Sequence, residues 1–266
     1  MIHALYKALL RGPRFRGRHR LENLLRRMLM PPVDTVDGVR MELDPQEWLQ
    51  IHMLAGQPTE PATTALFRRL LKAGDTYIDI GAHVGFHALA AAQCVGPTGR
   101  VLAVEPQPYN CAKLLINSQI NGLTNILVVM SAAGDSDGMI VLHDQKRNDK
   151  ARLSVVEGAG ISDVATRFEV PIQRIDTLHE RHAPGPVRLL KIDVEGYERQ
   201  VLSGAAATLE VTENLVFECL PDSSPEMVAE LVATLTGAGF SLRQVDGSPW
   251  TPGGAAIEHN VWAARA

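Results

Sequence analysis

The chain has 266 residues, of which 45% are hydrophobic and 21% charged, and its formal net charge at pH 7 is -4. This length can bury one substantial core, and the overall acidic balance argues against bulk binding to nucleic acid, so we expect no nucleic-acid partner. The three cysteines lie in apolar runs without metal-ligand spacing, which predicts a reduced, cytoplasmic setting.

Residues 1–45 are predicted to form a basic, partly helical N-terminal extension. Eight Lys and Arg residues accompany a single acid, Glu22, within the first 30 positions. Leucines at helical spacing between Leu21 and Leu29 favour either a peripheral helix on an anionic membrane or a solvated helix packed on its own domain. No apolar stretch approaches the roughly 20 residues that span a bilayer. Peripheral membrane contact is therefore an expectation for this segment alone.

Residues 46–266 are predicted to form one α/β domain. Short runs of Val, Ile and Leu alternate with longer segments of helical period, a pattern typical of parallel strands joined by helices. The nearly continuous apolar strands indicate a sheet with helices on both faces. We expect strands at 76–80, 100–104, 125–131, 187–192 and 215–219, and helices at 83–94, 109–121, 199–209 and 225–238.

Two stretches interrupt the alternation of strands and helices. Residues 138–176 hold two extended runs around a polar loop, which predicts an inserted hairpin near the carboxyl edge of the sheet. Near the C-terminus, residues 241–245 and 260–263 flank a loop rich in Gly and Pro, which predicts a closing antiparallel pair.

The segment from Tyr77 to Phe86 reads Tyr-Ile-Asp-Ile-Gly-Ala-His-Val-Gly-Phe and predicts a buried strand that turns sharply into a helix. Gly81 and Gly85 allow a tight turn and a close approach of backbone to a ligand, although a turn without a ligand would use the same glycines. Asp79, near the strand's carboxyl end, is placed to hold a cationic or hydrogen-bond-donating group.

Glu105 ends the next strand, about 24 residues after Gly81, where α/β nucleotide sites offer a carboxylate to ribose hydroxyls. Adenosine and NAD both present such hydroxyls. The dinucleotide fingerprint, however, needs a glycine where Ala82 stands, and the bulky His83 would crowd a pyrophosphate. The pattern favours S-adenosylmethionine as cofactor, with an NAD-dependent oxidoreductase or a non-catalytic nucleotide-binding module as alternatives.

A third cluster, Lys191-Ile-Asp-Val-Glu-Gly-Tyr-Glu198, crowds charges at the end of an apolar strand. Ligands bind at this edge in open α/β folds, so Asp193 is our candidate for the base that accepts a proton from an acceptor hydroxyl. Glu195 and Glu198 either shape the pocket or cap the following helix, since acids near a helix N-terminus are favourable.

Together, Asp79-Ile-Gly-Ala-His-Val-Gly85, Glu105-Pro106, Asn121 with Asn125, and Lys191-Ile-Asp-Val-Glu-Gly196 with Glu198 resemble the FkbM family of methyltransferases. The resemblance implies a Rossmann-like class I methyltransferase fold, whose seven-stranded, mostly parallel sheet has an antiparallel last strand. It also implies methyl transfer from S-adenosyl-L-methionine to a hydroxyl of a natural product, sugar, glycan or glycolipid. N-methylation is the alternative within the class.

The sequence departs from the family's pattern at two points. His83 stands where many relatives carry Asn, and Ser131-Ala132 stands where an acid before Ala often holds the adenine amino group. We keep His83, Ser131 and Ala132 as cofactor-binding candidates, and add Glu60 as a contact to the cofactor's amino group. His87, one helical turn after His83, either lines the acceptor pocket or packs in the core. The scattered histidines predict no metal site.

Overall fold

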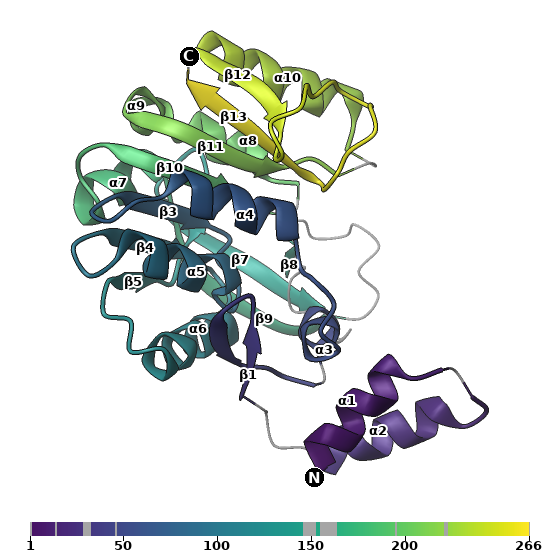
Figure 1. The fold of residues 1–266 in the computed structure, drawn as a ribbon. Coiled ribbons are helices and arrows are strands. Elements are labelled where there is room, and N and C mark those ends of the chain that lie inside the picture. Colours follow the sequence, from purple (N-terminus) through teal and green to yellow (C-terminus); the bar gives the residue numbers. More distant parts are fainter. Residues whose placement is uncertain are drawn as a thin grey trace.

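The structure is a computed structural model that describes residues 2–13, 15–28, 33–45, 47–145, 153–154, 164–194, 196–220 and 223–265 (Figure 1). The helices are α1 (Ile2–Arg11), α2 (Arg18–Met28), α3 (Trp48–Leu54), α4 (Pro61–Leu70), α5 (Phe86–Val95), α6 (Pro108–Ile120), α7 (Ile175–His182), α8 (Glu198–Ser203), α9 (Ala206–Glu210) and α10 (Pro225–Gly237). The strands are β1 (Val33–Val36), β2 (Val39–Glu42), β3 (Thr76–Ile80), β4 (Arg100–Val104), β5 (Ile126–Val129), β6 (Ala132–Ala133), β7 (Gly138–Gln145), β8 (Leu153–Ser154), β9 (Val164–Gln173), β10 (Val187–Ile192), β11 (Thr212–Glu218), β12 (Phe240–Gln244) and β13 (Asn260–Arg265).

The central element is a seven-stranded sheet in the order β12-β13-β11-β10-β3-β4-β5. The neighbours from β11 to β5 pair in parallel, while β13 is antiparallel to both β11 and β12. The predicted α/β sheet and its closing antiparallel pair are therefore confirmed. The sequence order reverses between β10 and β3, and ligands bind at such a switch point in open α/β sheets.

Helices cover both faces of this sheet, as the apolar strands predicted. Alternate residues of a strand point to opposite faces, so Ile78 and Ile80 pack with α7, α8, α9 and α10, while Tyr77 packs with α4 and α5. The same period of two places Asp79 and Lys191 on the face of α4 and α5. Charged groups from two neighbouring strands thus share one face at the carboxyl ends of the sheet.

The predicted helix at 199–209 is two helices, α8 and α9. The break lies at Gly204, where an added Cβ would come within 2.0 Å of the carbonyl oxygen of Gly134. Close approach of these two backbone segments explains both the glycine and the break, and the sequence pattern contained no sign of the partner segment.

The inserted hairpin predicted at 138–176 is present as β7 and β9, which pair antiparallel from Gly138–Ile172 to Gln145–Val164. Together with β6 and β8 these strands form a second, four-stranded sheet, of which Figure 1 labels β7, β8 and β9. The predicted range extends slightly too far, because α7 begins at Ile175.

The N-terminal segment contains the predicted helix, α2, and a β1–β2 hairpin that we did not predict. Its backbone binds α6: the Glu42 N–H donates to Asn117 (2.7 Å) and the Arg40 N–H to Asn121 (2.9 Å). Buried Val39 contributes to the apolar cluster that also holds Leu89 of α5. The boundary placed at residue 45 stays a prediction.

Candidate functional site

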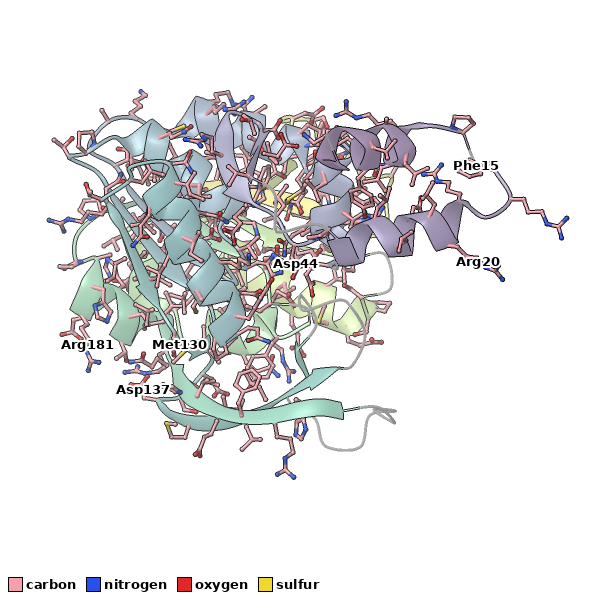
Figure 2. The ribbon with its side chains drawn as sticks, turned by 90° about the horizontal axis from the view of Figure 1, so that it is seen from below. Phe15, Arg20, Asp44, Met130, Asp137 and Arg181 are labelled. Carbon is pink, nitrogen blue, oxygen red and sulfur yellow. The ribbon has the colours of Figure 1, made fainter. Side chains whose placement is uncertain are left out.

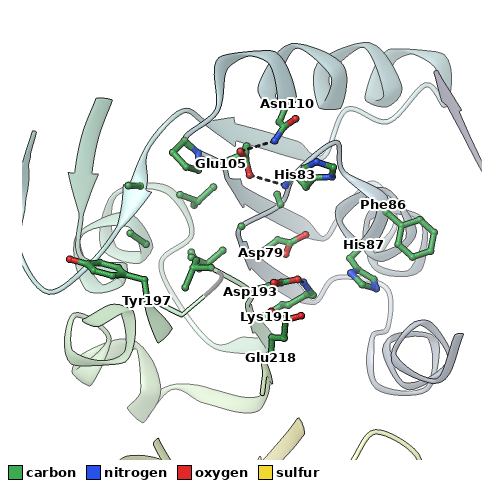
Figure 3. A pocket seen from close by; sticks show the side chains of 18 of the residues that line it. Asp79, His83, Phe86, His87, Glu105, Asn110, Lys191, Asp193, Tyr197 and Glu218 are labelled. Atoms are coloured by element: carbon green, nitrogen blue, oxygen red, sulfur yellow. Dashed lines mark hydrogen bonds and ion pairs between the residues drawn. The ribbon is translucent and has the colours of Figure 1, made fainter. Parts of the chain in front are cut away.

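A cavity of about 330 Å³ lies at the carboxyl ends of β3, β4 and β10 (Figure 3). Most residues proposed from the sequence meet there, although they lie far apart in the chain. Those that line it are Glu60, Asp79, Gly81, His83, Glu105, Ser131, Ala132 and Asp193.

Asp79 contributes the most buried carboxylate of the cavity, with 1% of its surface exposed. Neither oxygen has a hydrogen-bond partner among the described residues. Burial raises the pKa of Asp79 to about 6, and the charge of Lys191 partly offsets this effect. The Tyr77 hydroxyl also lowers the pKa, although its geometry falls short of a regular hydrogen bond. A buried acceptor without a donor is a place where a ligand's ammonium or hydroxyl group would bind.

Lys191 is the Cα partner of Asp79 across the β10–β3 pair and is 2% exposed. Its ammonium group lies 2.6 Å from Oδ2 of Asp193. Burial alone would lower the pKa of Lys191, but the charges of Asp193, Asp79 and Glu60 outweigh it and raise the pKa. Lys191 is therefore a cation among Asp193, Asp79 and Glu60, and Figure 3 labels the first two of these acids beside it.

Glu105 is held rigidly at the end of β4. One carboxylate oxygen accepts from the His83 N–H at 2.9 Å, and the other accepts from the Gln107 N–H at 3.0 Å and from Asn110 at 3.1 Å. Figure 3 draws the bonds from His83 and Asn110 as dashed lines. Burial nevertheless raises the pKa of Glu105 to about 7. A carboxylate has about four acceptor positions, so capacity remains for a ligand hydroxyl.

The two glycines of the loop are required by the protein's own packing. A Cβ on Gly81, whose φ is +84°, would lie 1.8 Å from the carbonyl oxygen of Asp193. A Cβ on Gly85, with φ +94°, would lie 2.7 Å from Leu114 of α6. Gly81 borders the cavity, but Gly85, also among the described residues, is not part of its lining.

His83 adopts the left-handed conformation with φ 50°, and its backbone N–H donates to Glu105. Asn and His tolerate this region better than most residues, which gives a physical reason why one can replace the other at this point of the loop. The turn therefore requires a residue that tolerates a left-handed backbone at position 83. The side chain of His83 also lines the cavity.

Glu60 and His87 form the side of the cavity next to α4 and α5. Glu60 accepts from Asn260 at 2.7 Å and lies 3.5 Å from His87 Nε2. It precedes α4 but does not cap it, because Glu258 accepts the N–H groups of Ala62 and Thr63 instead. Burial raises the pKa of Glu60 and lowers that of His87 well below its usual value. His87 is therefore a neutral imidazole in the lining.

The opposite wall is apolar and comes partly from the inserted hairpin. Ile140, Leu142 and Ile172 of β7 and β9 line the cavity next to Ala132. Ser131 is fully buried, and its hydroxyl donates to backbone carbonyls.

The remaining candidates are placed differently. Glu198 is buried in the first turn of α8, accepts from the Gly196 N–H at 3.1 Å, and does not belong to the lining that the structure describes. Its position agrees with the capping alternative. Glu195 lies outside the described residues.

Sequence reasoning missed several lining residues. Leu49 and Met53 come from α3, while Tyr197 and Glu218 follow β10 and end β11. Glu218 shares a period of two with buried Val216, the one signal that could have pointed to it. Among the described residues, no group of three or more His, Cys, Asp or Glu side chains is arranged to hold a metal ion.

A parallel sheet of this strand order, with acids from β3, β4 and β10 around one cavity at its switch point, defines an α/β protein of the class I methyltransferase type. Known proteins agree. The FkbM methyltransferase domain matches residues 79–242. The chain belongs to the FkbM methyltransferase family and is a methyltransferase, which confirms the fold and family expected from the sequence.

Individual relatives are distant. The 31-O-demethyl-FK506 methyltransferase FkbM of Streptomyces tacrolimicus is 27% identical over 65% of this chain and 75% of its own. The hexuronic acid methyltransferase AglP of Haloferax volcanii is 24% identical over 76% of this chain and 80% of its own. The solved FkbM methyltransferase from Methylobacillus flagellatus KT shares the fold with a TM-score of 0.50 and 16% identity, covering 81% of this chain and 52% of that one.

Proposed function

We propose that this protein transfers a methyl group from S-adenosylmethionine to a hydroxyl group of a small molecule or glycan. The observation that carries the proposal is the convergence of Asp79, Glu105 and Asp193 on one cavity from three neighbouring strands. Family membership supplies the reaction class. Because the family consists of methyltransferases, the alternatives of an NAD-dependent oxidoreductase and a non-catalytic nucleotide-binding module are no longer supported.

The residues present fit the cofactor. The unpartnered oxygens of Asp79 would receive donors of the amino-acid end, with Glu60 beside them, and the remaining acceptor position of Glu105 would receive a ribose hydroxyl. The apolar wall next to Ser131 and Ala132 would hold the adenine ring. When bound, S-adenosylmethionine supplies an electrophilic methyl group on a sulfonium.

Asp193 is the proposed proton acceptor. Its side chain is half-buried and lines the cavity, while Lys191 fixes one of its oxygens through the ion pair. An oriented carboxylate can take a hydroxyl proton as the acceptor oxygen forms its bond to carbon, and a base of this kind contributes roughly 10²- to 10⁴-fold. Holding the acceptor in line with the methyl group contributes further.

Hydroxyl acceptors are favoured over amines by the base itself, since an amine acceptor can react without one. The names of the two relatives point to oxygen acceptors: one describes an O-demethyl substrate, and the other a hexuronic acid, which carries hydroxyls and a carboxyl group. Both kinds of molecule fit the proposed class of small-molecule or glycan acceptors.

The test is incubation of the purified protein with methyl-labelled S-adenosylmethionine and fractionated extracts of its host, followed by mass and NMR analysis of labelled products. We expect a product heavier by one methylene unit whose methyl carbon is bound to oxygen. A product methylated only on nitrogen would contradict the choice of acceptor and leave the cofactor assignment standing.

A further inference from the structure

The helical hairpin, formed by α1 and α2, projects from the body next to α3 (Figure 1). Its inner side is part of the protein core: Tyr6 is 1% and Leu25 6% exposed, and both pack in the cluster that contains Phe86 of the cavity wall. This side needs no further partner.

Several basic residues of the hairpin are already used to hold its shape. Arg18 donates to the carbonyls of Gly12 and Leu10 and pairs with Glu22 at 2.6 Å. Arg11 donates to the carbonyl of Ala55 at 2.9 Å, which fixes the hairpin to the end of α3. The hairpin is thus a built element with a defined orientation on the body.

Its outer side remains apolar and cationic. Phe15 is 52% exposed, and Leu21 and Leu24, three residues apart on one face of α2, are also exposed. The side chains of Arg16 and Arg20 are exposed, and neither guanidinium group forms a hydrogen bond or ion pair with any residue that the structure describes. Figure 2 shows Phe15 and Arg20 at the outer end of the hairpin.

Charge is strongly segregated along the chain. Residues 1–30 contain eight of the 26 Lys and Arg residues but one of the 30 Asp and Glu residues. An anionic surface would therefore attract the hairpin and repel the acidic rest of the chain. The protein would approach such a surface with the hairpin facing it. Exposed Phe and Leu beside unpaired Arg are the composition that inserts shallowly at the boundary of headgroups and acyl chains.

We propose that the outer side of the helical hairpin, with Phe15, Arg16, Arg20, Leu21 and Leu24, docks the protein on an anionic lipid surface. The arginines bind lipid phosphates, and the apolar side chains enter the interface between them. Because Arg11 ties the hairpin to α3, whose Leu49 and Met53 line the cavity, the bound membrane lies next to this wall of the methyltransferase site.

The test is co-sedimentation of the full chain with vesicles of phosphatidylcholine alone and of phosphatidylcholine with 30% phosphatidylglycerol. We expect binding to the anionic vesicles, with loss at 1 M salt, where the Debye length falls to about 3 Å. Arg16→Glu with Arg20→Glu should weaken binding by at least about 25-fold, because each arginine near an anionic surface contributes roughly fivefold to the affinity. Leu21→Ser with Leu24→Ser should weaken it by roughly tenfold.

Matched controls are Arg181→Glu on α7 and Leu115→Ser on α6, which change equally exposed residue types on other helices and should bind as the unchanged protein does. Circular dichroism checks that every variant is folded. Equal sedimentation of the Arg16→Glu, Arg20→Glu variant and the unchanged protein would overturn the proposal. The proposal would also be overturned if the unchanged protein did not bind vesicles and the Arg16→Glu, Arg20→Glu substitutions dissociated a dimer. The hairpin would then bind a second copy of the chain. Neither result depends on methyl transfer.

Discussion

The ammonium group of Lys191 lies 2.6 Å from Oδ2 of Asp193, and the same residue pairs in register with Asp79 on the neighbouring strand. One buried cation thereby balances carboxylates from two strands. Glu60, which directly precedes α4, is a third acid whose charge interacts with Lys191. The site's electrostatics depend on this single side chain.

Lys191→Met should therefore destabilise the protein by about 3 kcal/mol at pH 8, because breaking a buried pair leaves carboxylates uncompensated. Asp79 already has a pKa of about 6, raised by burial, and loss of Lys191 would raise it further. A raised pKa of a folded-state acid costs stability as pH rises through the range between the unfolded and folded pKa values. The deficit should consequently be smaller at pH 5 than at pH 8.

Urea denaturation of the Lys191→Met variant at the two pH values measures this effect. Lys72→Met is the control, since Lys72 is exposed, and we expect a change within about 0.5 kcal/mol there. An identical deficit at pH 5 and pH 8 would mean that Lys191 does not act through the neighbouring acids.

Glu105 should make nucleoside binding depend on pH. Burial raises its pKa to about 7, and only the ionised form keeps its remaining oxygen lone pair for a ribose hydroxyl, since His83, Gln107 and Asn110 bind the others. Affinity for 5′-methylthioadenosine, which has the ribose but no amino-acid end, should rise roughly tenfold from pH 6 to pH 8. The missing amino-acid end separates this effect from that of Asp79.

Calorimetry with Glu105→Gln should show weaker binding with a flat pH profile, while Glu180→Gln, an exposed change on α7, should keep the slope. If Glu105→Gln retains the full slope, another group titrates and the ribose assignment fails.

Gly81→Ala should be much more destabilising than an ordinary glycine substitution. Its Cβ would meet the Asp193 carbonyl oxygen at 1.8 Å, so β3 and β10 would have to separate. We expect a loss of at least about 3 kcal/mol. Gly122→Ala shares the positive φ but has no atom within 4 Å of the added Cβ, and should cost about 1 kcal/mol. Equal thermal midpoints of the two variants would show that the contact with Asp193 relaxes freely.

Asp193→Asn should lower methyl transfer by roughly 10²- to 10⁴-fold and change the affinity for S-adenosylhomocysteine by less than about threefold. His87→Asn is the informative comparison, because the neutral His87 imidazole also lines the cavity and is chemically able to accept a proton. We expect less than a tenfold effect from it. The reverse ranking of the two variants would transfer the role of base to His87.

The part of the cavity at Asp79, Gly81 and Glu105 could be predicted because its signals are local. A strand, a glycine and an acid at a fixed spacing are sufficient to place Asp79, Gly81 and Glu105 at one sheet edge. The parallel strands were equally predictable, since a strand buried on both faces is apolar throughout. The reason for a glycine at position 81 nevertheless differs from the expected approach of a ligand. The space that a Cβ would need is occupied by the backbone carbonyl of Asp193.

Residues that meet only through tertiary structure gave no such signal. Leu49 and Met53 belong to a short helix, and Ile140 belongs to the inserted hairpin, so their place in the cavity depends on how whole elements pack. Glu198 was ambiguous for a related reason. A carboxylate after a strand and before a helix serves equally well as a ligand contact or as a favourable charge at the helix N-terminus, so the sequence pattern alone does not choose between the two roles.

Calorimetric titration of the protein with S-adenosylmethionine, S-adenosylhomocysteine and NAD tests the proposed cofactor most directly. We predict saturable one-to-one binding of both sulfur nucleosides, abolished or strongly weakened by Asp79→Ala with Glu105→Ala, and no response to NAD at the same concentrations. Binding of NAD without binding of either sulfur nucleoside would contradict the proposed methyl transfer from S-adenosylmethionine.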